Sequence, residues 1–367
     1  MIPAERAHLF VAALSHRGMK KGKNNEDRYA ISSYYLAEDD DTPLLFAIIA
    51  DGVGGHLAGE VAAEMVVDYV SQAVAESDAK NPLTIIEQAV IGASQAVNNL
   101  AAEDERKYGM GATCVCAWII DNRLYTGSVG DSRLYLMHGA TIQQLTTDHT
   151  WIQEALDKGI LTPEQARTHP NAHVIRQYVG GKNLPQVDFR LRLHSDPANK
   201  DEKVDARRSN QGLPLKAGDT LLLCSDGLTD LVWNDEILEI VRSGKDLESA
   251  AKTLINTANE RGGHDNITVI LLSLPQDGTK RNFKKFLPWI IAGGITLLIG
   301  LAIFIGFVWH LVQPIETLTP TVTPTVVVAP ELSLTPEFTT PSTLFPSPTE
   351  ISATYTPWPT NTPQPVE

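Results

Sequence analysis

Apolar and polar positions along residues 1–275 follow two periods, one typical of β-strands and one of α-helices. Apolar runs of strand length predict strands over residues 8–14, 44–50, 112–120, 124–129, 133–137, 187–193, 220–224 and 267–273. Helical spacing predicts a helix over 57–74, and helix-start residues predict three more, which begin near Asn81, Thr162 and Asp246. Because several strands between 112 and 146 are consecutive, the pattern favours an α+β fold with antiparallel sheets and helices packed outside them.

A different pattern begins at Phe286, where 30 residues contain no Asp, Glu, Lys or Arg. Residues 287–309 are long and apolar enough for a transmembrane helix, and a core helix seldom runs this long without a charge. The segment 276–286 before the span holds four Lys or Arg residues, and none follows it. Basic residues stay inside, so we expect a single-pass protein of the cell membrane, with its N-terminal part cytoplasmic and its C-terminal tail extracytoplasmic.

The tail, residues 310–367, is rich in Pro and Thr. Its last 55 residues hold 12 Pro and 18 Ser or Thr. Proline removes backbone donors and few large apolar groups remain to bury, so we expect a disordered or polyproline-like stalk. Whether it carries sugars or is an unmodified spacer stays open, and a weaker interpretation makes it an adhesion stalk.

The net charge argues against nucleic-acid binding, and the cysteine spacing argues against a disulfide framework and a zinc site. The 367 residues include 30 Lys or Arg and 44 Asp or Glu, which gives a net charge of -14. Such a chain repels a phosphate backbone, so we expect no nucleic-acid partner. The three cysteines have neither disulfide-framework nor zinc-ligand spacing, and we interpret Cys114, Cys116 and Cys224 as buried small hydrophobes.

Carboxylates recur where the predicted strands begin or end. Asp51-Gly52, Asp131 and Asp226-Gly227 follow strands, whereas Glu26-Asp27 and Asp265 precede them. A single Asp-Gly usually marks a turn, but several carboxylates gathered at one edge of a sheet repel each other unless protons or cations compensate. Because these are hard oxygen ligands with no His/Cys cluster, they indicate Mg²⁺ or Mn²⁺.

These motifs occur in the order found in metal-dependent Ser/Thr protein phosphatases of the type-2C family, which the chain resembles over roughly residues 8–273. The matching motifs are Asn25-Glu26-Asp27, Asp51-Gly52-Val-Gly-Gly55-His56, Met110-Gly111-Ala-Thr113, Gly130-Asp131-Ser132-Arg133, Ser225-Asp226-Gly227-Leu228 and Asp265-Asn266. The resemblance is to a bacterial-type, membrane-anchored member. It implies two antiparallel β-sheets sandwiched between layers of α-helices, followed here by one transmembrane helix and a disordered tail.

The resemblance also implies a binuclear Mn²⁺ or Mg²⁺ centre that activates a water for attack on phosphate. Asp51 would bridge the two ions, and Asp226 and Asp265 would complete the first site. The Gly52 carbonyl and Glu26 would serve the second. A weaker third ion would be held by Asp131.

Two positions depart from the family pattern. Gly22 replaces the arginine that grips substrate phosphate, and we expect Lys21 to bind the phosphate instead. Val53 replaces a histidine present in many eukaryotic members, so His56 becomes the candidate general acid. The alternative for His56 is a structural or loop-capping role. Residues 148–180 match the flap beside the cleft, and we expect its histidines to be solvent-facing or capping rather than metal ligands.

The predicted function is hydrolysis of phosphoserine and phosphothreonine in proteins, and the alternative is a catalytically silent phosphoprotein-binding module tethered to the membrane. A silent relative is expected to have lost Asp51, Asp226 or Asp265, and all three are present. Expected partners are phosphorylated proteins, with Ser/Thr kinases and their substrates as candidates. The predicted divisions are a phosphatase domain (1–275), a basic linker (276–286), a span (287–309) and a tail (310–367).

Overall fold

The computed structural model describes residues 1–53, 57–167, 169–171, 173–193 and 210–276. The chain divides into one unit over Met1–Leu287 and another over Pro288–Glu367. All described residues belong to the first unit, so the predicted span and tail lie outside the described part of the chain.

The first of two main sheets has six antiparallel strands in the order β1-β3-β4-β7-β8-β11. These strands are β1 (Ile2–Pro3), β3 (Arg28–Ala37), β4 (Asp40–Ala50), β7 (Cys114–Ile120), β8 (Arg123–Val129) and β11 (Leu213–Pro214). Seven consecutive residues of β4, from Leu44 to Ala50, are buried, as expected for a central strand covered on both faces.

The second sheet has five antiparallel strands in the order β10-β9-β12-β13-β2. These are β2 (Phe10–His16), β9 (Arg133–His138), β10 (Thr141–Gln144), β12 (Thr220–Cys224) and β13 (Ile267–Ser273). A small third sheet pairs β5 (Gly52–Val53) with β6 (Gly111–Ala112) next to the end of β4.

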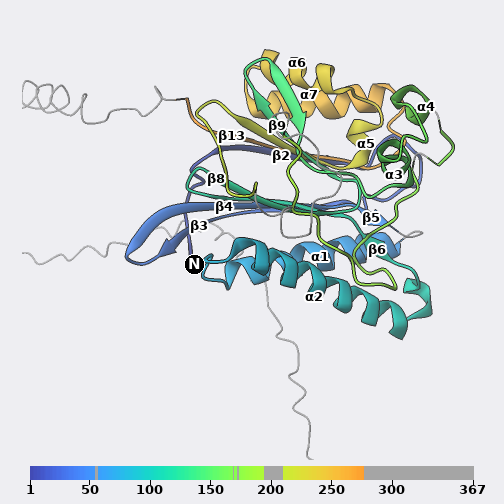
Figure 1. Cartoon of the computed structure of the whole chain (residues 1–367), viewed down its shortest axis with the longest axis horizontal. Helices are drawn as coiled ribbons and strands as arrows, with labels where there is room; N and C mark the ends of the chain where they lie inside the picture. The colour runs from blue at the N-terminus through green and yellow to red at the C-terminus, as the bar shows by residue number, and fades with distance from the viewer. Residues whose placement is uncertain (54–56, 168, 172, 194–209, 277–367) are drawn as a thin grey trace, which may run out of the picture. The chain divides into compact units, whose positions relative to one another are not determined.

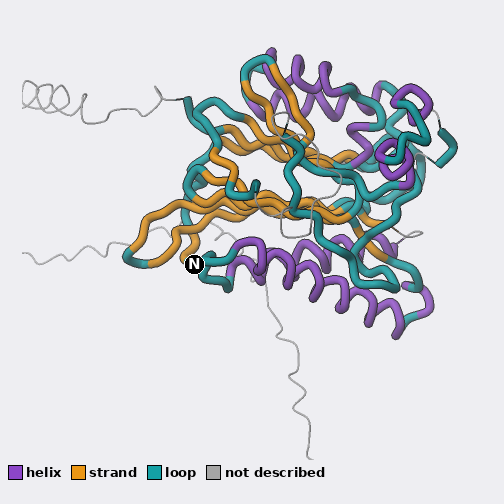
Figure 2. The backbone as a smooth tube through the Cα atoms, viewed as in Figure 1, coloured by secondary structure: helices purple, strands orange, loops and turns teal. Residues whose placement is uncertain are grey.

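Helices cover the outer face of each main sheet (Figure 1). The long helices α1 (Leu57–Ala75) and α2 (Pro82–Glu103) lie on the first sheet, and α6 (Asn234–Ser243) and α7 (Leu247–Glu260) lie on the second. The shorter helices are α3 (Trp151–Asp157), α4 (Pro163–Arg167) and α5 (Asp226–Thr229). Figure 2 shows the resulting order of layers as helix, strand, strand and helix.

Three buried clusters hold these layers together. One lies between the first sheet and α1 and α2, and includes Phe46 and Trp118 packed edge to face at 6.2 Å. The second fills the space between the sheets and includes Leu45, Val115 and Leu223. The third joins the second sheet to α5, α6 and α7. Alternate residues of one strand, such as Phe46 and Leu45, enter different clusters because side chains alternate across a strand.

The predicted α+β sandwich of antiparallel sheets and helices is confirmed. The strand over 267–273 matches β13, and the Asp246 cap is observed, since its Oδ1 accepts the Ser249 N–H at 2.8 Å. The predicted strand over 187–193 is wrong. Only Asp188 of this segment forms a bridge, to Ser128 of β8. The Asn210 and Gln211 side chains bond the neighbouring backbone, and β11 pairs with Arg123 and Leu124 at the start of β8.

None of the described helices has the length and apolar character that crossing a membrane requires. The predicted span, 287–309, falls among residues that the structure does not describe.

Candidate metal centre

The predicted carboxylates meet where strands of both main sheets end. β3 begins opposite the end of β4, with Arg28 paired to Ala50, so Glu26 and Asp51 emerge from neighbouring strands. In the second sheet Cys224 at the end of β12 pairs with Val269 near the start of β13, which brings Asp226 close to Asp265. Antiparallel pairing therefore gathers carboxylates from distant parts of the sequence.

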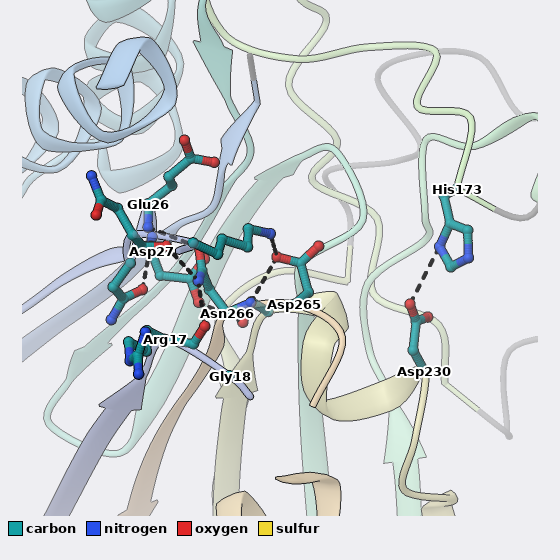
Figure 3. A network of polar contacts seen from close by, with 12 residues as sticks. Arg17, Gly18, Glu26, Asp27, His173, Asp230, Asp265 and Asn266 are labelled. Atoms are coloured by element: carbon teal, nitrogen blue, oxygen red, sulfur yellow. Dashed lines mark hydrogen bonds and ion pairs between the residues drawn. The ribbon is translucent and has the colours of Figure 1, made fainter. Parts of the chain in front are cut away.

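Asn266 fastens the two sheets together at this point (Figure 3). Its side-chain Oδ1 accepts the Glu26 N–H at 2.8 Å. Its Nδ2 donates to the carbonyls of Arg17 and Asn24 at 3.0 and 2.9 Å. The amide is 1% exposed, so water does not compete for these bonds. Asn266 thus fixes the loop before β3 against the loop that carries Asp265.

Asp27 is the second cross-link between the sheets. Its Oδ2 accepts from Ser225 Oγ at 2.8 Å and from Thr268 Oγ1 at 2.6 Å. Burial raises the pKa of Asp27, and the two hydroxyl donors oppose that rise. The sequence marks Asp27 only as part of a motif, because its partners lie 198 and 241 residues away.

Thr113 positions Asp51 and Asp131 relative to each other. The Asp51 N–H donates to Thr113 Oγ1 at 2.9 Å, and the Thr113 N–H returns a bond to the Asp51 carbonyl at 2.8 Å. The same hydroxyl lies 2.7 Å from Ser132 Oγ, next to Asp131. The one predicted motif without a carboxylate, Met110-Gly111-Ala-Thr113, therefore holds two of the carboxylate loops.

Glycines beside the aspartates allow close backbone approach. A Cβ at Gly52 would lie 2.4 Å from the carbonyl oxygen of Gly59, and one at Gly227 would lie 2.0 Å from that of Asn266. Real Cβ atoms are not found at such distances, so a side chain at Gly52 would displace α1 and one at Gly227 would displace the loop of Asn266.

The cluster carries unbalanced negative charge. Burial, followed by repulsion from Asp27 and Asp226, raises the pKa of Asp51 well above its usual value. Burial and the neighbouring Asp131 and Asp230 do the same to the pKa of Asp226. Such a cluster stays ionised at neutral pH only when cations compensate.

Divalent cations fit this set of donors. Among the described residues, Asp131 Oδ1 and Asp226 Oδ1 are buried without a hydrogen-bond partner, although buried carboxylates are normally bonded. The donors around them are oxygen atoms, which suit Mg²⁺ and Mn²⁺. The described part of the chain has one group of three acidic or His side chains with ligand atoms within 4.8 Å of one another, namely His173, Asp226 and Asp230.

Comparison with known proteins identifies the family. Residues 15–271 match the family model described as Protein phosphatase 2C. The chain belongs to the protein phosphatase 2C family. It is 34% identical over 272 residues to the protein phosphatase PhpP of Streptococcus pneumoniae, which covers 73% of this chain and 99% of PhpP. It is 36% identical over 253 residues to the serine/threonine phosphatase stp of Listeria monocytogenes, which covers 68% of this chain and 90% of stp.

A solved structure agrees with these sequence matches. The catalytic domain of the phosphatase PstP, in complex with 2 manganese ions, superposes with a TM-score of 0.57 at 30% identity. The match covers 72% of this chain and 97% of that domain. The chain is therefore a metal-dependent Ser/Thr phosphoprotein phosphatase. The predicted membership of the type-2C family, the activity and the use of Mn²⁺ or Mg²⁺ are confirmed, whereas membrane anchoring stays a prediction.

The other site residues predicted for this phosphatase differ in their exposure and contacts. Glu26 and Asp131 are 9% and 6% exposed at the edge of the cluster. Lys21 is exposed, and its contact with substrate phosphate stays a prediction. The ammonium of Lys23 instead forms an ion pair with Asp265. His56, the candidate general acid, lies outside the described residues.

A pocket of about 270 Å³ separates the phosphatase flap from the carboxylates and is lined by Asp131, Asp226 and residues of α3 and α4. His173 of the flap also lines this pocket. Its Nδ1 lies 3.3 Å from Asp230 Oδ2 (Figure 3). Sequence reasoning missed Asp230, although it lies four residues after Asp226, a spacing that puts two side chains on one face of a helical turn. The His149 ring accepts the Gly130 N–H at 3.2 Å, and His169 stacks on Trp151 at 4.7 Å.

Proposed function

We propose that this phosphatase holds two divalent cations between the loops after β4 and β12 and the loop before β13. Asp51, Asp226 and Asp265 are the proposed ligands of the first ion. The Gly52 carbonyl and Glu26 are the proposed ligands of the second, and Asp131 serves a weaker third. The observation that carries this assignment is the pair of buried oxygens, Asp131 Oδ1 and Asp226 Oδ1, that have no hydrogen-bond partner among the described residues.

Bound cations would supply the activation of water and the charge that stabilises the transferring phosphoryl group. The chain itself supplies the positioning. Asn266 and Asp27 fix the ligand loops across the two sheets, and Thr113 fixes Asp51 against the Asp131 loop. The pocket under the flap is the proposed entrance for the phosphorylated residue.

Phosphopeptide hydrolysis should withstand alkylation of the native protein with iodoacetamide. Cys114, Cys116 and Cys224 are all fully buried, and burial raises the pKa of each thiol. No side-chain nucleophile is required when the attacking group is water, so we expect at least ~90% of the activity to remain and no phosphoenzyme to form. Labelling with ³²P-phosphopeptide and mass spectrometry of the thiols check this. Loss of activity in proportion to alkylation of one cysteine would reopen the mechanism.

We further propose that residues 287–309 anchor the enzyme in the cell membrane, with the phosphatase domain cytoplasmic and residues 310–367 extracytoplasmic. The uncharged run and the basic residues before it support this topology. Phosphorylated proteins at the membrane, Ser/Thr kinases and their substrates among them, are then the proposed substrates.

The anchor predicts that the full-length chain sediments with membranes and resists extraction by salt and by carbonate. Changing Leu297 and Leu298 to Arg should release it, because each charge at the centre of a span costs about 2.5–3.5 kcal/mol. The same positions changed to Ile are the matched control and should stay in the membrane fraction. A wild-type chain found in the soluble fraction would refute the anchor. Protease added outside intact cells should remove only the tail, and cleavage of the phosphatase domain would refute the orientation.

A further inference from the structure

One lysine points into the carboxylate cluster. The Lys23 ammonium forms an ion pair with Asp265 Oδ1, and the charges of Asp51 and Glu26 act on it as well. Its side chain is 23% exposed, whereas Lys20 and Lys21 in the same loop are exposed to solvent. Lys23 is therefore the cation that this loop contributes to the cluster.

The loop is fastened on both sides of Lys23. Before it, the Met19 N–H donates to the Gly263 carbonyl at 2.8 Å, and a Cβ at Gly18 would lie 2.1 Å from the Asp265 carbonyl oxygen. After it, the Asn24 carbonyl accepts from Asn266 Nδ2 at 2.9 Å. The backbone thus holds the lysine next to Asp265, and only its side chain has to rotate for the pair to break.

The pair conflicts with the metal geometry. Ligand oxygens lie about 2.0–2.1 Å from a Mg²⁺ ion, so two ligands of one ion are at most about 4.2 Å apart. Among the described residues, the group whose ligand atoms lie within 4.8 Å of one another consists of His173, Asp226 and Asp230, and Asp265 is not part of it. Asp265 Oδ1 is instead in contact with the Lys23 ammonium, which opposes its use as a metal ligand.

We propose that Lys23 competes with the divalent cation for Asp265 and so weakens metal binding at the first site. This inference rests on the proposed ligand role of Asp265. Without metal, the ammonium neutralises part of the negative charge and stabilises the fold. When a cation binds, Asp265 exchanges the ammonium for the ion, and the affinity is lowered by the free energy of the lost ion pair and by repulsion between the two positive charges.

Calorimetric titration of the full-length, chelator-treated chain with Mn²⁺ in mild detergent tests this competition. Lys23→Met should lower the Kd of the tightest Mn²⁺ site about tenfold, which corresponds to ~1.4 kcal/mol. The same substitution should lower the Tm of the metal-free protein, because the carboxylates lose their internal cation. A purely structural lysine would give weaker Mn²⁺ binding together with the lower Tm. Lys23→Arg, which keeps the charge, should bind Mn²⁺ within about twofold of wild type.

Lys20→Met is the matched control, since it removes an exposed charge from the same loop, and its Kd for Mn²⁺ should stay within about twofold. An unchanged or higher Kd in Lys23→Met would overturn the competition. Asp265→Asn separates this failure from failure of the ligand assignment. If Asp265→Asn weakens Mn²⁺ binding while Lys23→Met leaves it unchanged, Asp265 is a ligand without a competitor. If Asp265→Asn leaves binding unchanged, both the ligand role and the competition are wrong.

Discussion

Asp226→Asn should reduce kcat for a phosphothreonine peptide by a factor of about 10³ or more at saturating Mn²⁺. The loss corresponds to ~4 kcal/mol of transition-state stabilisation. Asparagine keeps the size of the side chain but removes the charge that holds the ion and leaves only one oxygen as a ligand. For both the variant and wild type, kcat and the dependence of the rate on Mn²⁺ concentration are measured together. Weaker Mn²⁺ binding is then distinguished from a slower chemical step.

The same substitution should leave the fold intact and stabilise the metal-free protein. Folding raises the pKa of Asp226, so its ionised form destabilises the native state at neutral pH, and this cost disappears with the amide. We therefore expect a higher Tm in chelator and a smaller rise in Tm on adding Mn²⁺. Asp78→Asn, which changes an exposed aspartate paired with Lys80, is the control for both measurements. If Asp226→Asn keeps wild-type turnover at limiting Mn²⁺, Asp226 is not a ligand of the metal ions.

Chelation should abolish activity on phosphoserine and phosphothreonine peptides, to below about 1% of the Mn²⁺-loaded rate. It should also lower the stability of the fold, because a ligand that binds only the native state at 100 times its Kd adds ~2.7 kcal/mol. Adding back Mn²⁺ or Mg²⁺ should restore both properties. The control is the same chelator saturated beforehand with Mg²⁺. Full activity in excess free chelator would contradict a metal-dependent mechanism.

The enzyme should need more Mn²⁺ for activity as the pH falls. Burial raises the pKa of Asp51 and Asp226, so protons compete with cations for these carboxylates at a higher pH than for exposed ones. Lowering the pH from 8 to 6 should therefore increase the Mn²⁺ concentration needed for half-maximal activity. The maximal rate at saturating Mn²⁺ is measured in parallel, so that this shift is separated from titration of other groups.

The sequence predicts where the carboxylate loops lie because their signal is local. Asp51, Asp131 and Asp226 each follow a buried strand, and antiparallel pairing brings strand ends to a common edge. The strands themselves are recognisable because apolar residues run through them without interruption. The glycines next to Asp51 and Asp226 indicate that another backbone segment lies too close for a side chain. Such features can be recognised without knowing what lies on the other side of the cleft.

Other features depend on partners that only the folded chain brings close. Lys23 and Asp265 are separated by 242 positions, and nothing in the lysine-rich loop singles out Lys23 over Lys21. The segment 187–193 has the alternating burial of a strand, with Val187, Phe189 and Leu191 buried. It fails to form a strand because side chains occupy its backbone groups. Alternation predicts which side chains are buried, but not which group receives each backbone hydrogen bond.

Strand β13 would limit the reach of the phosphatase if residues 287–309 anchor it as proposed. Asp265 lies two residues before the first residue of β13, and Gln276, the last residue that the structure describes, lies three residues after its last. These two residues are eleven positions apart in the sequence, so they lie at most ~40 Å from each other at about 3.6 Å per residue. The ten residues 277–286 add at most about 36 Å when extended. Asp265 of an anchored enzyme would therefore act within ~75 Å of the membrane anchor. Tethering would give neighbouring membrane proteins a high effective concentration there, an advantage that freely diffusing phosphoproteins would not have.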